Sequence, residues 1–192
     1  MRMYKVRALS RFARQLMSRS TAYLMRWHHR AVTWRESVAE HHALTARMAY
    51  EMGLVLEWNG FGVRPEKLAI AAMYHDEEEL VTGDMPAPAK KLMPPGVLEK
   101  VAHDAIDTLW PDYPDDLAAH LREVAHQSKL NEMEKEVVEY ADKLAAFSYV
   151  FDTVELGNQK MIDILDRISS DEYLKSMDWD WLEFLREEWG LP

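Results

Sequence analysis

The sequence contains no cysteine among its 192 residues. This absence excludes disulfides, thiolate nucleophiles and cysteine-based zinc sites, and it permits a reducing intracellular setting. No segment approaches the ~20 consecutive apolar residues that a membrane-spanning helix needs, and the uninterrupted apolar core of a secretory signal is missing too. We therefore expect a soluble, cytoplasmic protein with no membrane partner.

The first 35 residues lack acidic side chains and hold nine of the 23 Lys and Arg residues. The rest of the chain carries the other 14 bases against all 33 acids, and the net charge is −10. Such an acidic body repels nucleic-acid backbones, because polymer binding depends on neutralising phosphates. The charge therefore argues against a nucleic-acid polymer as partner and favours a small phosphorylated ligand held in one positive pocket.

Alternating β-branched runs bounded by turns are also missing, whereas apolar residues recur with helical spacing along most of the chain. We therefore expect an all-α fold, a compact helical bundle. The length fits a single domain spanning 1–192, large enough to bury roughly 70% of its unfolded surface. Helices are predicted at 4–24, 37–53, 65–76, 96–109, 115–128, 132–156, 158–168 and 171–188.

Glycine and proline are few, and they mark the breaks between these helices. Residues 59–62 separate the second helix from the third, and 157–158 cap the longest one. The proline-rich connection from Thr82 to Gly96 exceeds the usual length of a helix connection, and such loops are often functional. Because it begins three residues after Glu79, we expect it at the rim of the site described next.

Four side chains of the kinds that bind divalent transition metals come from three separate segments. His75 and Asp76 adjoin in AAMYHDEEEL, His41 precedes them in SVAEHHALTARMAYEM, and Asp142 follows in VVEYADKLAAFSYVF. Mixed imidazole and carboxylate sets suit manganese, iron, cobalt, nickel or zinc better than calcium. A lone histidine or aspartate is usually an ordinary residue, so it is the ordered combination H…HD…D that predicts a metal-dependent phosphohydrolase.

Local patterns indicate how two of the segments present their ligands. Ser37 with Glu40 three residues later fits a capping box, which fixes His41 near the first turn of its helix. Asp142 lies mid-helix among apolar residues, where a buried carboxylate requires compensation such as a metal ion.

The HD pair needs a helix end to serve one ion, because His75 and Asp76 are about 100° apart around a helix. The loop that follows supplies that end. Glu79 stands four residues after His75 and three after Asp76, so on a continuing helix it projects from the same side. A carboxylate there is the natural acid/base beside a metal-activated water. The glutamates at 77–78 are expected to be solvated.

Further motifs flank this constellation, namely Arg26-Trp27, SVAEH, HDEEE, TGDMPAPAKK and EYAD. In this order they resemble the HD-domain 5′-deoxynucleotidases, which remove phosphate from 2′-deoxynucleoside 5′-monophosphates. HD alone is a weak signal, but the combination, from Arg26 to Asn158, is specific. It also disfavours a second interpretation of the basic N-terminus, a cleaved organellar transit peptide, because cleavage would remove part of the site.

The resemblance implies a role for each matched residue. His41, His75, Asp76 and Asp142 look like the ligands of one divalent ion, with cobalt, manganese or zinc expected and magnesium a further candidate. Glu79 looks like the catalytic acid/base, and Asp76 also counts among the residues that bind substrate.

The substrate pocket is implied in the same way. The basic N-terminal helix, 1–25, leads into Arg26, which resembles a phosphate-binding arginine whose fork gives two charge-assisted hydrogen bonds. Trp27 resembles the aromatic residue that crowds the 2′ position of the sugar and rejects ribonucleotides, and Asp84 resembles the acceptor of the 3′-hydroxyl. The nearby pocket wall is expected from Met85, Pro86 and Ala87.

Two parts of the chain depart from the family pattern. His28 and His29 are unusually polar for positions beside the pocket, so base preference is left open. The C-terminal helix, 171–188, is rich in tryptophan and acid and is expected to be peripheral, packing on the domain or on a partner subunit. The family resemblance also suggests a homodimer.

Two alternative functions remain at this point. Related HD enzymes, some of them phage-borne, resemble this chain and attack deoxynucleoside triphosphates, notably dATP; Lys90, Lys91 and the basic N-terminus are compatible with extra phosphates. A helical domain that binds nucleotide without cleaving it is the second alternative, and the complete ligand set with Glu79 argues against it.

Overall fold

The structure is a computed structural model that describes residues 11–16, 18, 20–169, 174 and 177–191. Within these ranges it holds helices and one isolated antiparallel bridge, between Met25 and Ser37, and no strand. The all-α prediction is confirmed. The elements are α1 (Arg11–Leu16), α2 (Ser20–Tyr23), α3 (Val38–Trp58), α4 (Pro65–Met73), α5 (Glu79–Thr82), α6 (Ala87–Lys90), α7 (Val97–Asp107), α8 (Asp115–Ala125), α9 (Glu132–Glu155), the 3₁₀ helix η1 (Gln159–Met161), α10 (Ile162–Ile168) and α11 (Asp180–Trp189).

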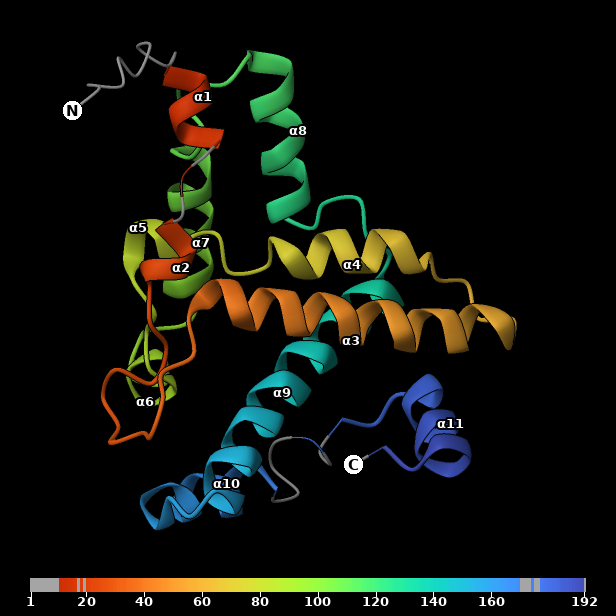
Figure 1. Ribbon diagram of the computed structural model, residues 1–192. Helices are drawn as coiled ribbons and strands as arrows, with labels where there is room; N and C mark the ends of the chain where they lie inside the picture. Colours follow the sequence, from red (N-terminus) through yellow and green to blue (C-terminus); the bar gives the residue numbers. More distant parts are fainter. Residues whose placement is uncertain (1–10, 17, 19, 170–173, 175–176, 192) are drawn as a thin grey trace, which may run out of the picture.

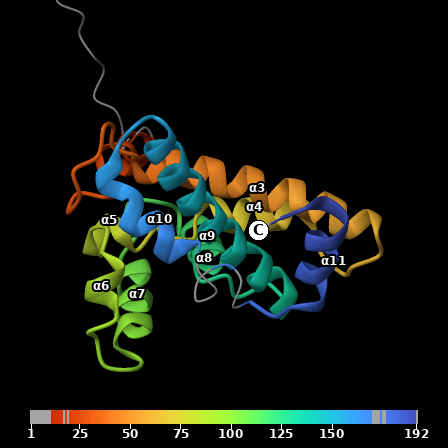
Figure 2. The same cartoon turned by 90° about the horizontal axis from the view of Figure 1, so that it is seen from below.

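The main core lies between α3, α4, α9 and α11. Helices α3 and α4 run side by side and α9 crosses them (Figures 1 and 2). Their buried side chains form one cluster that includes Leu56, Leu68, Tyr140 and Trp181. Burying a side chain such as leucine stabilises the fold by about 1.5–3 kcal/mol relative to leaving it exposed. This core fixes the three helices that deliver the predicted metal ligands.

Two smaller apolar clusters flank the main core. One joins the end of α9 to η1 and α10 around Met161, and Trp27 packs against it. The other joins α7 to α8 around Trp110, and Tyr74 packs against that one. Because Trp27 follows Arg26 and Tyr74 precedes His75, both clusters border the region of the predicted site.

Both long helices begin with a capping box, and each box satisfies backbone donors that a helix start leaves unpaired. At α3 the Ser37 hydroxyl accepts from the Glu40 N–H and the Glu40 carboxylate accepts from the Ser37 N–H, as predicted. At α9 Asn131 and Glu134 make the same pair of hydrogen bonds. The Glu134 carboxylate is also held by the Arg64 guanidinium at 2.7 and 2.8 Å.

The prediction of one continuous helix over 4–24 is wrong for the residues that the structure describes. Residues 4–10, 17 and 19 lie outside the described chain, and α1 and α2 are separate helices with Ser18 between them. The Ser20 N–H donates to the Ser18 hydroxyl at 3.3 Å. Serine side chains compete with the helix for backbone groups in this way, which accounts for the break.

The third predicted helix, 65–76, ends three residues early, at Met73. Residues 74–78 form turns, and α5 begins at Glu79, so the expected continuous helix through Glu79 is wrong. The His75 side chain competes with a continuing helix, since its Nδ1 donates to the Ala72 carbonyl at 2.6 Å, the acceptor that such a helix would offer to the Asp76 N–H.

At the C-terminus, the described part of the predicted helix 171–188 starts only at Asp180; residues 170–173, 175 and 176 lie outside the described chain. Helix α11 lies at the opposite end of the molecule from α5 and α6 (Figures 1 and 2). Although this places it away from the predicted site, Trp181 and Leu185 are fully buried in the main core.

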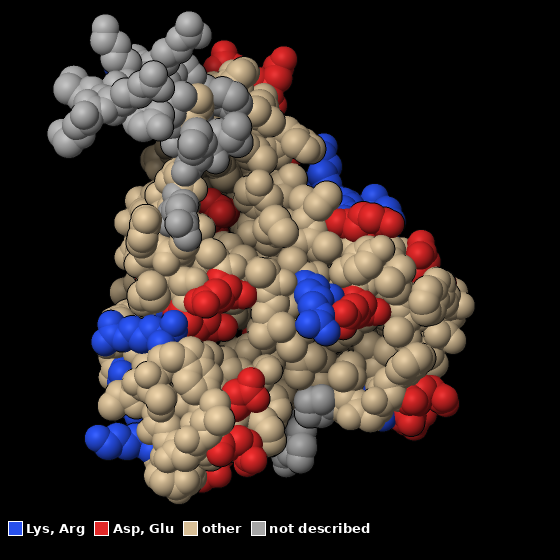
Figure 3. Space-filling model, in the orientation of Figure 1, with Lys and Arg blue, Asp and Glu red and all other residues tan. Residues whose placement is uncertain are grey.

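The face of the molecule in Figure 3 carries mixed charge. On the face seen in Figure 3, the Lys and Arg side chains of the described residues stand in small groups, several of them beside Asp and Glu. In the described part of the chain, every helix is too short or too polar to span a membrane.

Candidate metal centre and substrate cavity

The four predicted metal ligands meet at one point. His41 comes from the start of α3, His75 and Asp76 from the turn after α4, and Asp142 from the middle of α9. One donor atom of each residue lies within 4.8 Å of the others. His41 Nε2 is 2.9 Å from Asp142 Oδ1, and His75 Nε2 is 3.1 Å from Asp76 Oδ2. The structure thus brings together the side chains that the sequence singled out.

The charges of this cluster are compatible with a bound cation. Burial opposes ionisation of both carboxylates, but the charge of His75 lowers the pKa of Asp76, and the hydrogen bond with His41 lowers the pKa of Asp142 well below its usual range. Burial works against protonation of His75 as well, yet Asp76 and Asp142 raise its pKa well above the ordinary value. A proton on His75 therefore compensates the carboxylates, and a metal ion bound by the same atoms would displace it.

The donor set fits a divalent transition metal. Because the His75 Nδ1–H donates to the Ala72 carbonyl, its Nε2 is the nitrogen left to face the cluster. Burial lowers the pKa of His41, which favours the neutral imidazole that metals bind. Two imidazole nitrogens and two carboxylates are ligands suited to manganese, cobalt or zinc.

Arg26 lies directly beside the ligands. Its Nη1 donates to Asp76 Oδ2 at 3.1 Å, and its Nε lies 3.5 Å from Glu36 Oε2. Backbone pairing holds it there, since the Arg26 N–H donates to the Glu36 carbonyl at 2.9 Å next to the Met25–Ser37 bridge. Burial lowers the pKa of Arg26, but Asp76 and other acids more than restore it, so the guanidinium stays charged.

Trp27 is fixed on both sides. Its indole N–H donates to Glu36 Oε2 at 3.3 Å, and its ring stacks on Tyr149 with centroids 5.4 Å apart and planes 12° apart. Its φ of 59° is in the left-handed region, which non-glycine residues seldom adopt. This backbone conformation persists because the stacking and the hydrogen bond hold the side chain.

Glu36 is a site residue that sequence reasoning missed. Glu36 is only 6% exposed. Its Oε2 lies near Arg26 Nε and accepts a hydrogen bond from the Trp27 indole, and its Oε1 lies 3.9 Å from His41 Nδ1. Burial raises its pKa to about 7, against the opposing effect of Arg26. The sequence marks Glu36 only as the first acidic residue after the long acid-free stretch, and this position does not indicate a contact with Arg26 or Trp27.

Glu79 reaches the same site although its helix is not continuous with the HD pair. The side chain is 3% exposed, and its Oε2 has no hydrogen-bond partner among the described residues. Burial, and then the charge of Asp76, raise its pKa to about 8.

The expectation that both glutamates at 77–78 are solvated is wrong for Glu77. This residue is only 9% exposed, and burial raises its pKa to about 7.

A cavity of about 400 Å³ opens over the cluster. Its lining also includes His29, which the sequence places beside the pocket, and two residues of α10 that the sequence did not single out, Ile164 and Arg167. Their helical spacing carries no mark that separates a pocket residue from a core or surface one. The predicted site residues that line this cavity are Arg26, Trp27, Asp76, Glu79, Asp84, Met85, Pro86, Ala87 and Asp142.

Asp84 is placed by the turn that follows α5. Gly83 has a φ of 76°, which suits glycine, and the chain then enters the loop toward α6. The Asp84 carboxylate lies 3.4 Å from His28 Nδ1. The unusual histidine noted in the sequence therefore contacts a residue of the cavity wall.

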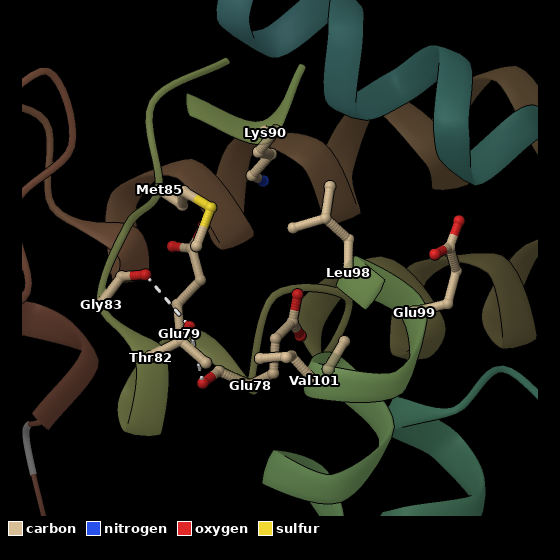
Figure 4. A pocket seen from close by; sticks show the side chains of 10 residues that line it. Glu78, Glu79, Thr82, Gly83, Met85, Lys90, Leu98, Glu99 and Val101 are labelled. Carbon is tan, nitrogen blue, oxygen red and sulfur yellow. Dashed lines mark hydrogen bonds between the residues drawn. The ribbon is translucent and has the colours of Figure 1, made fainter. Parts of the chain in front are cut away.

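A second hollow of about 250 Å³ adjoins the main cavity, and Figure 4 shows the residues that line it. Glu79, Met85 and Lys90 line both spaces and so form the partition between them. Leu98 and Val101 of α7 form the opposite side of the hollow in Figure 4. Glu79 therefore borders both spaces.

Solved structures share this architecture. An HD-domain phosphohydrolase from Listeria innocua superposes with a TM-score of 0.68 at 20% identity, covering 88% of this chain and 84% of that one. A protein from Pyrococcus horikoshii superposes with a TM-score of 0.70 at 22% identity, covering 90% and 94%. The fold is that of the HD-domain phosphohydrolase, with the metal-type residues at its centre.

Sequence comparison specifies the family. The family model of the YfbR-like 5′-deoxynucleotidases matches residues 14–186. A 5′-deoxynucleotidase from Cronobacter sakazakii is 31% identical over 133 residues, which is 66% of this chain and 65% of the relative's own length. One from Yersinia pseudotuberculosis is 30% identical over 144 residues, 70% of each chain. The chain belongs to the YfbR-like 5′-deoxynucleotidase family, and the resemblance seen in its motifs is confirmed.

Proposed function

We propose that this chain is a metal-dependent phosphohydrolase that removes phosphate from 2′-deoxynucleoside 5′-monophosphates. The observation that carries the proposal is the convergence of His41, His75, Asp76 and Asp142 within 4.8 Å, next to a cavity of about 400 Å³. The relatives named above are 5′-deoxynucleotidases, which supports the same substrate class here.

One divalent ion would be held by these four residues, with cobalt, manganese or zinc expected and magnesium a further candidate. When bound, the ion supplies positive charge to the phosphate and makes water a better nucleophile. The remaining chemistry comes from the side chains around it.

Arg26 binds the phosphate in this proposal. Asp76 and Glu36 hold its guanidinium in place and keep it charged, so its donors are oriented before substrate arrives. Fixed positive charge that stabilises the transferring phosphoryl group is the usual source of catalysis in this chemistry.

Glu79 handles the proton. Burial and the charge of Asp76 raise the pKa of this carboxyl to about 8 before a metal binds, which favours its protonated form, and its Oε2 is the atom without a partner among the described residues. It can donate that proton to the departing 5′-oxygen and, once ionised, accept one from the attacking water. Water and the phosphate monoester then become deoxynucleoside and inorganic phosphate.

Sugar selection falls to two residues of the cavity wall. Trp27, immobilised by Tyr149 and Glu36, crowds the 2′ position, where a ribonucleotide carries a hydroxyl. Asp84 accepts a hydrogen bond from the 3′-hydroxyl, and His28 lies close enough to orient that carboxylate.

A deoxynucleoside triphosphate is the second candidate substrate, because Lys90, Lys91 and Arg167 line the same cavity and add positive charge. The products separate the two activities, since a monophosphatase releases inorganic phosphate and the alternative releases triphosphate. The mixed surface charge of the face in Figure 3 favours either small substrate over a polymer.

A panel of deoxyribonucleoside and ribonucleoside monophosphates and deoxynucleoside triphosphates, assayed with cobalt, manganese and zinc and with product identification, tests the proposal. We expect inorganic phosphate from the deoxynucleoside monophosphates. Triphosphate as product would favour the second candidate, and inertness toward every substrate would favour a non-catalytic nucleotide-binding domain.

The Trp27→Ala variant in the same panel tests sugar selection. Removing the ring opens space at the 2′ position, so we expect the ratio of kcat/KM for deoxyribonucleotide over ribonucleotide to fall toward one. Trp34→Ala is the matched control, because Trp34 also contacts Tyr149 but is not a cavity residue. An unchanged ratio in Trp27→Ala would remove this residue from the specificity role.

The family resemblance also leads us to predict that the protein acts in the cytoplasm and forms a homodimer. Analytical ultracentrifugation of the full chain measures the assembly directly.

A further inference from the structure

Away from the active site, three metal-type side chains gather where α7 and α8 end. His103 and Asp107 are one turn apart on α7, and His126 is the C-cap of α8. Asp107 Oδ1 lies 3.2 Å from His126 Nε2, and Asp107 Oδ2 lies 3.4 Å from His103 Nδ1. One donor atom of each residue lies within 4.8 Å of the other two.

The spacing of these donors suits one small cation. Metal–ligand bonds of about 2.0–2.2 Å place the ligands of a tetrahedral ion roughly 3.5 Å from one another. The two separations from Asp107, one from each carboxylate oxygen, are close to this value. The rings of His103 and His126 are stacked, with centroids 4.4 Å apart and planes 29° apart, so both imidazoles already flank the carboxylate.

The position also favours positive charge. Asp107 is the last residue of α7 and His126 caps α8, so both helix C-termini direct their partial negative charge toward the cluster. The side chains of His103 and Asp107 are 62% and 53% exposed, which gives an ion direct access from solvent. Arg122, whose charge opposes a cation here, donates to the Leu109 carbonyl at 2.8 Å.

We propose that His103, Asp107 and His126 form a second metal site, which takes a divalent transition ion such as Zn²⁺ or Ni²⁺. Two imidazoles and one carboxylate select such borderline ions over Ca²⁺ or Mg²⁺, and the remaining coordination positions fall to water. The site is separate from the active-site cluster and takes no part in hydrolysis.

The expected consequence is structural. An ion here binds α7 and α8 at once and stabilises the folded chain, because the unfolded chain does not hold the three donors together. These two helices share the apolar cluster against which Tyr74 packs, next to the HD pair. The ion therefore stiffens the support behind the active site without contacting the substrate.

Metal stoichiometry tests the proposal. The full chain is stripped with EDTA, dialysed to equilibrium against Zn²⁺ and analysed for bound metal. We expect two ions per wild-type chain, one in the His103→Ala/His126→Ala variant and one in the His75→Ala/Asp76→Ala variant. His120→Ala, which removes an exposed histidine of α8 outside the cluster, should still bind two.

A second readout guards against an unfolded variant. In the His75→Ala/Asp76→Ala background, Zn²⁺ should raise the Tm, and adding Asp107→Asn, which keeps the size of the side chain, should abolish the rise. Three results would overturn the proposal. They are one bound ion per wild-type chain, two bound ions per His103→Ala/His126→Ala chain, or a Tm of the His75→Ala/Asp76→Ala variant that Zn²⁺ does not raise. The three residues would then be a hydrogen-bonded link between two helices and nothing more.

Discussion

At the scale of single residues, one buried carboxylate connects the parts of the active site. Glu36 reaches the guanidinium of Arg26 and the indole of Trp27, and it lies 3.9 Å from Nδ1 of His41. Groups that hold a metal ligand or a phosphate-binding arginine from behind fix its orientation. In the proposed mechanism, phosphate binding, sugar selection and metal binding therefore all depend on this side chain.

The Glu36→Gln variant tests this dependence. An amide of the same shape removes the charge that holds Arg26 and weakens the acceptor of the Trp27 N–H. We expect kcat/KM for deoxynucleoside monophosphates to fall about 10–100-fold, with weaker metal binding. Glu51→Gln, which changes an exposed glutamate of α3 paired with Arg47, is the control and should behave as wild type. Equal activity in both variants would contradict the connection.

Glu79 gives a second residue-scale prediction. Glu79→Gln removes the proton carrier and keeps the volume, so we expect kcat to fall by about 10²–10⁴ while the metal stays bound. Exposed Glu99, on the far side of the second hollow, is the matched control for Gln substitution. Steady-state kinetics with metal analysis decide the outcome, and an unaltered kcat in Glu79→Gln would exclude its acid/base role.

Residue type and order were enough to predict that the four metal-type side chains come together and that Glu79 lies beside them. They were not enough for Glu36 or for Arg167 of α10. Glu36 belongs to the segment before α3 and Arg167 to the last turn of α10. Whether they reach the site depends on how these segments pack beside the metal-type residues. That is decided by packing between distant segments, which periodicity does not encode.

At the scale of elements, the close approach of α3 and α4 fixes where His41 stands relative to the HD pair. Gly53 makes this approach possible, since a Cβ there would lie 2.7 Å from Leu68 Cδ1 and 3.1 Å from Pro65 Cα. This packing explains why α3 continues through Gly53 to Trp58, whereas the sequence predicts an end at residue 53.

The Gly53→Ala variant measures the tightness of this crossing. Alanine gains about 1 kcal/mol of helix propensity, but overpacking against α4 costs about 1–3 kcal/mol. Because one clash involves backbone, we expect overpacking to prevail and the free energy of unfolding to decrease. Gly62→Ala is the control, because a Cβ there meets nothing within 4 Å. Urea denaturation measures both, and a Gly53→Ala variant more stable than wild type would refute the tight crossing.

The existence and type of the long helices could be predicted from periodicity and from the capping box at Ser37. The end of α4 could not, because it depends on the hydrogen bond from the His75 side chain to Ala72. That bond aims Nε2 at the cluster and leads the chain into turns that bring Glu79 back to the site. The end of α4, three residues earlier than the sequence predicts, is thus part of how the site is built.

At the scale of the whole molecule, the site lies where the main core and the two smaller apolar clusters meet. The main core sets α3, α4 and α9, one smaller cluster holds Trp27, and the other supports Tyr74 beside the HD pair. Each cluster therefore secures a different part of the site. We propose that the three clusters together position the four metal-type side chains to hold one divalent ion for phosphate removal.

Metal removal and return, compared between wild type and Asp76→Ala, tests that claim most directly. Phosphate release from a deoxynucleoside monophosphate is measured after EDTA treatment and again after Mn²⁺ is restored. We predict that stripped wild type is inactive and recovers with Mn²⁺, whereas Asp76→Ala stays inactive in both conditions. Phosphate release by metal-free wild type, or by metal-stripped Asp76→Ala, would contradict the account.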